Sequence, residues 1–260
     1  MARESAIARE AAREAGRALR ERFGSRSITA HKGLNDVQLE ADLAAQRIIV
    51  RHLLEAFPHH GVVAEEEPYT HWSDQPFVWA VDPLDGTNNF GYGIAHCAIA
   101  ISLFDRDRVR LALVLDPLSQ REYVATAHSP LPSVPTTEVA MEEAVVSLVT
   151  NYSDTGYEWF RRADALAAKG CRRAVNLWAP ALDLALVASG AIDAMVCHAG
   201  YLLDVCGGLF LVQSAGGCVL DRDGYPFTAR RSMHDKPLSF VAARSSALAH
   251  RLLEAGFLSD

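Results

Sequence analysis

The stretch Trp79–Phe90, WAVDPLDGTNNF, joins an apolar strand to a sharp turn and the start of a helix. The apolar run ends at Asp82, and the Pro83 ring fixes its own φ angle before the chain turns. Gly86 permits a close approach of the backbone at this turn. Asp82 and Asp85, three residues apart, can therefore converge on one point. Carboxylates, together with a loop carbonyl, are the ligands that Mg²⁺ prefers, so the stretch predicts a cation site.

The residues after the turn predict a phosphate-binding backbone. Gly86, Thr87 and Asn88 open a short helix, and the first N–H groups of a helix have no partner within it. Such groups bind anions, phosphate among them. A plain turn that caps a helix is the alternative interpretation of this stretch when it is taken alone.

Three further acidic residues favour the metal interpretation. Glu65 directly follows the apolar strand Val62–Ala64, at a carboxyl end where α/β proteins tend to form their sites. Asp42 lies on a helix expected over residues 36–57, at the edge of its buried face, where a charge needs a partner. Asp204 begins a helix rich in small residues. Taken singly, these acids could also be a solvated loop residue, an exposed first-turn acid and an N-cap.

The composition is that of an acidic globular protein. The chain has 260 residues, 50% of them hydrophobic and 22% charged, and its net charge is −7. This charge argues against DNA or RNA as a partner, since nucleic acids are held by basic side chains. No stretch of about 18 apolar residues predicts a membrane span. The five cysteines form no C-x-x-C pair, which predicts reduced thiols and a cytoplasmic location.

The order of the expected elements predicts two lobes. Residues 1–23 have the spacing of an amphipathic helix, and the neighbouring strand candidates between residues 98 and 127 indicate an antiparallel meander. A Pro/Ser/Thr stretch over residues 128–137 is typical of a lobe boundary. Strands and helices alternate after it, as in a layered α/β lobe. We predict an N-terminal α+β lobe over residues 1–140, which carries most metal ligands, and a C-terminal α/β lobe over residues 141–260.

These elements together resemble the inositol monophosphatase family. Asp82–Phe90 fits the family's signature D-P-[LI]-D-G-T-x-N-F throughout, and Ala64–Glu66 resembles its G-E-E element. The segment from Lys32 to Asp42 is similar to the lysine loop and D-x-x-T-x-x-D element, with a leucine in place of the threonine. Leu203–Gly208 resembles the second signature, W-D-x-x-[AG]-G. The resemblance implies an α+β fold, a layered α-β-α-β-α sandwich of the inositol monophosphatase and fructose-1,6-bisphosphatase type.

The resemblance also implies a metal centre. Two or three Mg²⁺ ions would share the ligands Glu65, Asp82, Leu84 (through its carbonyl), Asp85 and Asp204. Two cations about 3.5–4 Å apart stabilise both the attacking and the leaving oxygen of an in-line displacement. The resemblance further implies a homodimer that is inhibited by Li⁺.

Three residues would carry the chemical step by the same resemblance: Asp42, Glu65 and Thr87. Thr87, hydrogen-bonded to Asp42, would orient a metal-activated water and help to deprotonate it. Asp42 would bind through water near Glu65, at a third and weaker ion. The phosphate would rest on the N–H groups of Gly86 and Thr87.

The substrate side departs from the family pattern. Before its A-L-D-L-A element the family usually carries Gly-Ser/Thr-Ala, where this chain has Trp178-Ala179-Pro180. Cys197 replaces a glutamate that typically binds an inositol hydroxyl, and we expect inositol phosphate to be a poor substrate as a result. Trp178 and His198 are candidates for contact with another substrate, or are a core residue and a surface turn residue. The expected substrate-binding residues are Asp85, Gly86, Thr87, Trp178, Pro180, Cys197 and Asp204.

Three functions fit the sequence. The first is a Mg²⁺-dependent phosphatase acting on a small phosphorylated metabolite such as a sugar or cyclitol phosphate. The second is a phosphatase for a nucleotide, a nucleoside phosphate or histidinol phosphate. The third is an inactive family member that binds a ligand or a protein partner, and the intact set of acids and Thr87 argues against it.

Overall fold

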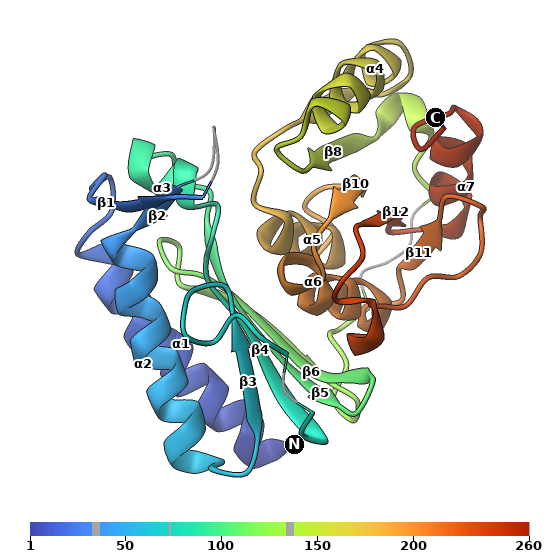
Figure 1. Cartoon of the computed structure of the whole chain (residues 1–260). Coiled ribbons are helices and arrows are strands. Elements are labelled where there is room, and N and C mark those ends of the chain that lie inside the picture. Colours follow the sequence, from blue (N-terminus) through green and yellow to red (C-terminus); the bar gives the residue numbers. More distant parts are fainter. Residues whose placement is uncertain (33–36, 73, 134–137, 260) are drawn as a thin grey trace.

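A computed structural model describes residues 1–32, 37–72, 74–133 and 138–259. Its described residues form five layers, in which two β-sheets are separated by a pair of helices and flanked by two further pairs (Figure 1). This arrangement confirms the predicted α-β-α-β-α sandwich. In order across the molecule, the helix layers are α1 (Ala2–Arg20) with α2 (Glu40–Ala56), α5 (Pro180–Ala188) with α6 (Leu202–Ser214), and α4 (Asp154–Gly170) with α7 (Ser246–Glu254).

The first sheet confirms the predicted antiparallel meander and adds a parallel edge. Its strands are β3 (Gly61–Ala64), β4 (Phe77–Asp85), β5 (Ala98–Asp105), β6 (Arg108–Asp116) and β7 (Arg121–Thr126), in that spatial order. β3 pairs with β4 in parallel, and the other pairs are antiparallel. Because β3 and β4 run in the same direction, Glu65 and Asp82 lie at the same end of the sheet.

The second sheet mixes parallel and antiparallel pairs. Its strands are β8 (Val145–Thr150), β9 (Arg173–Val175), β10 (Ala194–Gly200), β11 (Cys218–Asp221) and β12 (Leu238–Ala243), in the order β11-β12-β10-β8-β9. β8 is parallel to β9 and β10, whereas β12 is antiparallel to β10 and β11. The smaller elements are β1 (Ile28–His31), β2 (Val37–Leu39), α3 (Thr87–Tyr92) and the 3₁₀ turns η1 (Met141–Glu143) and η2 (Arg231–Met233).

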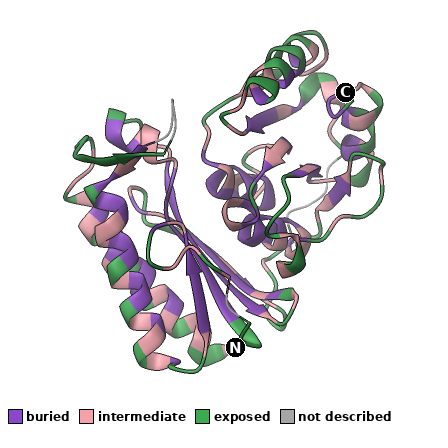
Figure 2. Ribbon diagram, in the orientation of Figure 1, coloured by how far each residue is buried: buried purple, intermediate pink, exposed green. Residues whose placement is uncertain are grey.

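The hydrophobic core follows the layers. One cluster joins α1 and α2 to the first sheet, a second lies around α5 and α6 between the sheets, and a third joins the second sheet to α4 and α7. Figure 2 shows the buried residues concentrated on the strands and on α5 and α6. In α1, the buried Ala8, Ala11, Ala12, Ala15 and Leu19 form one stripe at helical spacing. In the described parts of the chain, no helix has the length and apolar character needed to cross a lipid bilayer.

The helix expected over residues 36–57 begins later than predicted. Val37–Leu39 is a strand that pairs with β1, and α2 begins at Glu40. Val37 and Leu39 are buried on alternate positions, which is the strand period. The Leu39 N–H donates to Asp42 Oδ2 at 2.9 Å, which satisfies an N–H at the start of the helix. Residue 36 and residues 134–137 of the predicted boundary lie outside the described residues.

Candidate active site

A β-bulge brings Asp82 and Asp85 to the same cavity. Asp82 pairs with Ala100 and Asp85 with Ala98, so two residues of β4 oppose one residue of β5. Residues three apart on a regular strand point to opposite faces, and an extra residue in the strand removes this difference. The Leu84 N–H donates to Asp82 Oδ1 at 3.0 Å and fixes that side chain. The bulge is thus the local reason why the D-P-L-D sequence places two carboxylates together.

Thr87 connects the turn to α2. Its Oγ1 lies 2.9 Å from Asp42 Oδ1 and 2.9 Å from the Leu84 carbonyl oxygen, and its single hydroxyl proton can serve one of them at a time. Asp42 is fully buried, deeper than the edge position that the sequence predicted. Burial, followed by the charge of Glu65, raises the pKa of Asp42 to about 7. Asp42 is therefore a buried carboxyl group with a pKa close to neutral pH, and it lies within hydrogen-bonding distance of the Thr87 hydroxyl.

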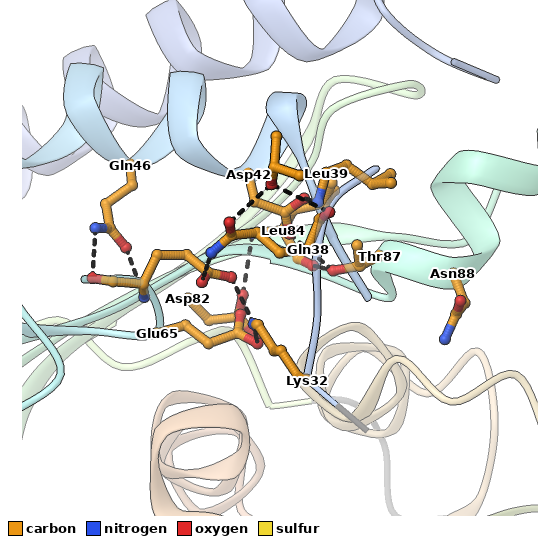
Figure 3. A network of polar contacts seen from close by, with 12 residues as sticks. Lys32, Gln38, Leu39, Asp42, Gln46, Glu65, Asp82, Leu84, Thr87 and Asn88 are labelled. Atoms are coloured by element: carbon orange, nitrogen blue, oxygen red, sulfur yellow. Dashed lines mark hydrogen bonds and ion pairs between the residues drawn. The ribbon is translucent and has the colours of Figure 1, made fainter. Parts of the chain in front are cut away.

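Glu65 and Glu66 form an acidic pair at the end of β3 that Lys32 neutralises in part. Lys32 Nζ lies 2.6 Å from Glu65 Oε1 (Figure 3). The same ammonium group also contacts Glu66. Gln46 fixes the backbone of Glu66 by donating to its carbonyl at 2.7 Å and accepting from its N–H at 2.9 Å. Asp42, Glu65 and Glu66 offer carboxylate oxygens within 4.8 Å of one another. Carboxylate oxygens grouped in this way are ligands of the type that hard cations prefer.

Asp204 approaches the same cavity from the other sheet's side. It lies in the first turn of α6, and its charge adds to burial, the main cause, in raising the pKa of both Asp82 and Asp85. α5 also contributes, because the N–H of Leu182 donates to Asp85 Oδ2 at 3.0 Å. The acidic site is therefore assembled from β3, β4, α2 and two helices of the middle layer.

The acidic side chains of the site together carry more negative charge than Lys32 can balance. Burial raises the pKa of Asp82 well above its ordinary range, and the charge of Glu65 adds to this effect. Burial also raises the pKa of Asp85 and Glu65, although Lys32 opposes the effect at Glu65. Deprotonated carboxylates this close together require a cation nearby. The donor set, oxygen throughout, fits a hard cation such as Mg²⁺.

A cavity of about 500 Å³ lies at the centre of this arrangement. All of the residues predicted for metal or substrate binding border it, and Asp42 lies behind Thr87 rather than on its wall. Those residues are Glu65, Asp82, Leu84, Asp85, Gly86, Thr87, Trp178, Pro180, Cys197 and Asp204. Cys197 is fully buried, and burial raises the pKa of its thiol to about 12, so the thiol is neutral.

Of the two candidates for substrate contact, Trp178 borders the cavity and His198 does not, and two further aromatic residues that the sequence did not predict border it as well. His198 is not among the residues that border the cavity; its ring stacks on Trp159, with centroids 5.2 Å apart. Tyr152 and Trp72 do border the cavity. Neither stands in a motif, so no local signal in the sequence identified them.

The fold and the acidic cavity together define a layered α/β protein with a candidate centre for hard cations. The profile of the inositol monophosphatase family matches residues 2–255, so the chain belongs to the inositol monophosphatase family. The Nus factor SuhB of Pseudomonas aeruginosa is 34% identical over 235 residues, with 84% of this chain and 85% of that protein covered. Inositol monophosphatase 3 of Solanum lycopersicum is 31% identical over 240 residues, with 86% and 89% covered.

Solved structures show the same fold. The IMPase of Thermotoga maritima superimposes with a TM-score of 0.82 at 26% identity, with 98% of this chain and 96% of that chain covered. The extragenic suppressor protein suhB of Bartonella henselae gives a TM-score of 0.86 at 24% identity, with 100% and 99% covered. The family predicted from the sequence is confirmed by these comparisons, as is the fold.

Proposed function

We propose that this chain is a Mg²⁺-dependent phosphatase that hydrolyses a small phosphate monoester. The observation that carries the proposal is the meeting of four buried or half-buried acids and a helix start at one cavity, with the buried Asp42 behind them. In the reaction, a water oxygen bonds to phosphorus and the bond from phosphorus to the ester oxygen breaks. The products are the alcohol, which takes up a proton, and inorganic phosphate.

The metal would be held by the ligands already named on β3, β4 and α6: Glu65, Asp82, the Leu84 carbonyl, Asp85 and Asp204. When bound, Mg²⁺ supplies positive charge that lowers the pKa of water and stabilises the reacting phosphate. Asp42, next to Glu65, is the candidate for a third and weaker ion. The convergence of carboxylates whose pKa values are raised by burial supports this assignment.

The chain's own groups would position the phosphate and move the proton. The N–H groups of Gly86 and Thr87 at the start of α3 would bind phosphate oxygens. The Thr87 hydroxyl would orient the attacking water, and Asp42, 2.9 Å away, would accept the proton. Glu65 would complete this catalytic group by holding the water on the side of Asp42.

Several further properties belong to the same proposal. The substrate side of the site would be formed by residues 141–260 and the metal side mainly by residues 1–140. We expect Li⁺ to inhibit, the protein to form a homodimer, and the enzyme to work in the cytoplasm, where its five unpaired cysteines stay reduced.

A phosphate-release assay tests the proposal. Purified protein is incubated with a panel of sugar, cyclitol, nucleoside and amino-alcohol phosphates, and malachite green reports inorganic phosphate. We expect release from at least one ester with Mg²⁺ and none after addition of EDTA. Full activity in EDTA would exclude the metal mechanism. If no ester in the panel releases phosphate in the presence of Mg²⁺, the result would instead favour a non-catalytic family member.

A further inference from the structure

Trp178 occupies a backbone conformation that its side chain disfavours. Its φ angle is 46°, in the left-handed region, where a bulky residue is a clear exception. Its indole N–H is also buried without a hydrogen-bond partner among the described residues. Both features destabilise the fold locally. Conformations of this kind persist where the surrounding structure enforces them, and they occur preferentially at functional sites.

The Trp178 ring belongs to an aromatic group that is attached to the phosphate-binding turn. Its centroid lies 4.5 Å from that of Tyr152 and 5.9 Å from that of Tyr157. Asn88, the residue after Thr87, donates from Nδ2 to the Tyr152 hydroxyl at 3.2 Å. The aromatic wall, defined here as Trp178 and Tyr152, is therefore held in a fixed relation to the place where the phosphate would bind.

This wall is not core packing. Trp178, Tyr152 and Asn88 border the active-site cavity, and the same three residues border a second cavity of about 430 Å³. The Tyr152 side chain is 41% exposed. A tryptophan retained for packing is surrounded by side chains, whereas this one has space beside it that a ligand can fill.

Three side chains of the cavity suit a flat apolar group better than a polyol. They are Val149, Pro180 and the neutral thiol of Cys197, and none of the three is a strong acceptor for ring hydroxyls. Polar side chains, among them Thr150 and Asn151, border the cavity as well. An aromatic ring, in contrast, gains by stacking on tryptophan or tyrosine.

We propose that Trp178, supported by Tyr152, binds a planar aromatic or heteroaromatic ring on the alcohol part of the substrate. The protein would therefore hydrolyse phosphate monoesters of ring-bearing alcohols in preference to polyol phosphates. This proposal rests on the phosphatase function proposed above.

Two matched esters test the proposal. 2-Phenylethyl phosphate and 2-cyclohexylethyl phosphate have leaving alcohols of nearly equal acidity and carbon number, and they differ in the planarity of the ring. For the wild-type protein with Mg²⁺, we expect KM for the phenyl ester to be about fivefold to tenfold lower, with similar kcat, as stacking of one ring allows. Trp178→Leu should bring the two KM values within about twofold by raising KM for the phenyl ester, and Trp178→Phe should retain part of the difference.

Two controls separate stacking from a general effect on the site. Inhibition by inorganic phosphate should be the same in wild type and in Trp178→Leu, because phosphate contacts the turn and not the wall. Trp72 borders the same cavity but stacks on His234, 5.5 Å between centroids. Trp72→Leu should therefore keep the preference for the phenyl ester.

The other outcomes would refute either the ring-binding role of Trp178 alone or the phosphatase function as well. Equal KM values in the wild type, hydrolysis of polyol phosphates alone, or loss of the preference in Trp72→Leu in place of Trp178→Leu would refute the ring-binding role and leave the phosphatase in place. Absence of phosphate release from every ester, glycerol phosphate included, would refute both proposals.

Discussion

Gly86→Ala should damage both stability and catalysis, and the structure allows its two causes to be separated. Gly86 has a φ angle of 81°, and a Cβ built there would lie 2.9 Å from the His96 carbonyl oxygen and 3.1 Å from the Ala179 Cβ. The carbonyl cannot retreat freely, because it accepts a hydrogen bond from Asn89 Nδ2 at 2.9 Å. Gly224 has nearly the same φ angle, 83°, but a Cβ there would meet nothing within 4 Å. Gly224→Ala is therefore a matched control for the φ angle alone.

The expected magnitudes follow from these contacts. An alanine in the left-handed region costs about 1–2 kcal/mol, and the loss of freedom in the unfolded chain returns about 0.4–1 kcal/mol. Gly224→Ala should thus lower the free energy of unfolding by about 1 kcal/mol. Crowding adds about 1–3 kcal/mol at Gly86, so the total there is about 2–4 kcal/mol. At about 2–4 °C per kcal/mol for a chain of this size, the Tm should fall by about 2–4 °C in Gly224→Ala and by about 4–16 °C in Gly86→Ala.

Activity distinguishes the two variants further. A shift of about 1 Å in the turn would misplace the N–H of Thr87 and its hydroxyl, which can reduce kcat by about 10²-fold. Gly224→Ala should leave kcat unchanged. Thermal unfolding and phosphate release, measured on both variants, provide the comparison. Equal losses of Tm would show that the His96 carbonyl does not constrain the turn, and wild-type kcat in Gly86→Ala would remove this turn from phosphate binding.

Four other outcomes are expected. Hydrolysis should require Mg²⁺ and stop in EDTA, since the acids have too little positive charge to balance them; unchanged rates in EDTA would contradict this. Thr87→Ala should lower kcat by about 10²–10⁴-fold and leave the Mg²⁺ affinity nearly unchanged, whereas Asp85→Asn should raise the Mg²⁺ concentration that the enzyme requires. Measurements of the rate at increasing Mg²⁺ concentration distinguish the two effects. In EDTA the free energy of unfolding should fall by about 2–3 kcal/mol between pH 5 and pH 8. The pKa of Asp42 is about 7 in the folded protein and 3.8 for a free side chain, so in this range the folded protein loses a proton that the unfolded chain has already lost. A rise in stability over this range, measured by urea unfolding, would refute the burial of this charge. Finally, kcat/KM for myo-inositol 1-phosphate should be at least about tenfold below that of the best substrate, because Trp178, Pro180 and Cys197 stand where the family usually has small or acidic residues that contact the ring hydroxyls. A panel in which this ester ranks first would reject that interpretation.

The sequence predicted the acidic side of the site better than its other side, for a physical reason. Asp82 and Asp85 lie within one turn, and Glu65 directly follows a strand, so their placement depends on a few adjacent residues. The order of the layers followed from the resemblance to the family, whereas the residue patterns alone indicated the antiparallel meander and the alternating strands and helices of the second lobe. The start of α2 was not, because Val37–Leu39 pairs with a segment several residues away and this pairing overrides the helical pattern.

The sequence singled out Trp178, but the pairing of Trp178 with Tyr152 could not be predicted, because the two residues meet only in three dimensions. Tyr152 follows β8 and Trp178 precedes α5, and Asn88, which donates to Tyr152, lies on α3, so the wall and its support come from three separate segments. The left-handed φ angle of Trp178 gives no signal in the sequence, since most residues with such angles are glycine or asparagine. The sequence showed that the residue is unusual for its family, and the structure shows its neighbours.

The segment before α5 links the two sides of the site. Asn89 donates to the carbonyls of His96 and Leu177, the latter directly before Trp178. Two residues further on, Pro180 begins α5, and the N–H of Leu182 holds the carboxylate of Asp85. The segment that carries Trp178 therefore also fixes the carboxylate of Asp85, a metal-ligand candidate, and accepts a hydrogen bond from Asn89 on α3. A movement of this segment would therefore displace Trp178 and change the orientation of Asp85 together. Under the proposed function, binding of the alcohol group at Trp178 would help to align the groups that act on its phosphate.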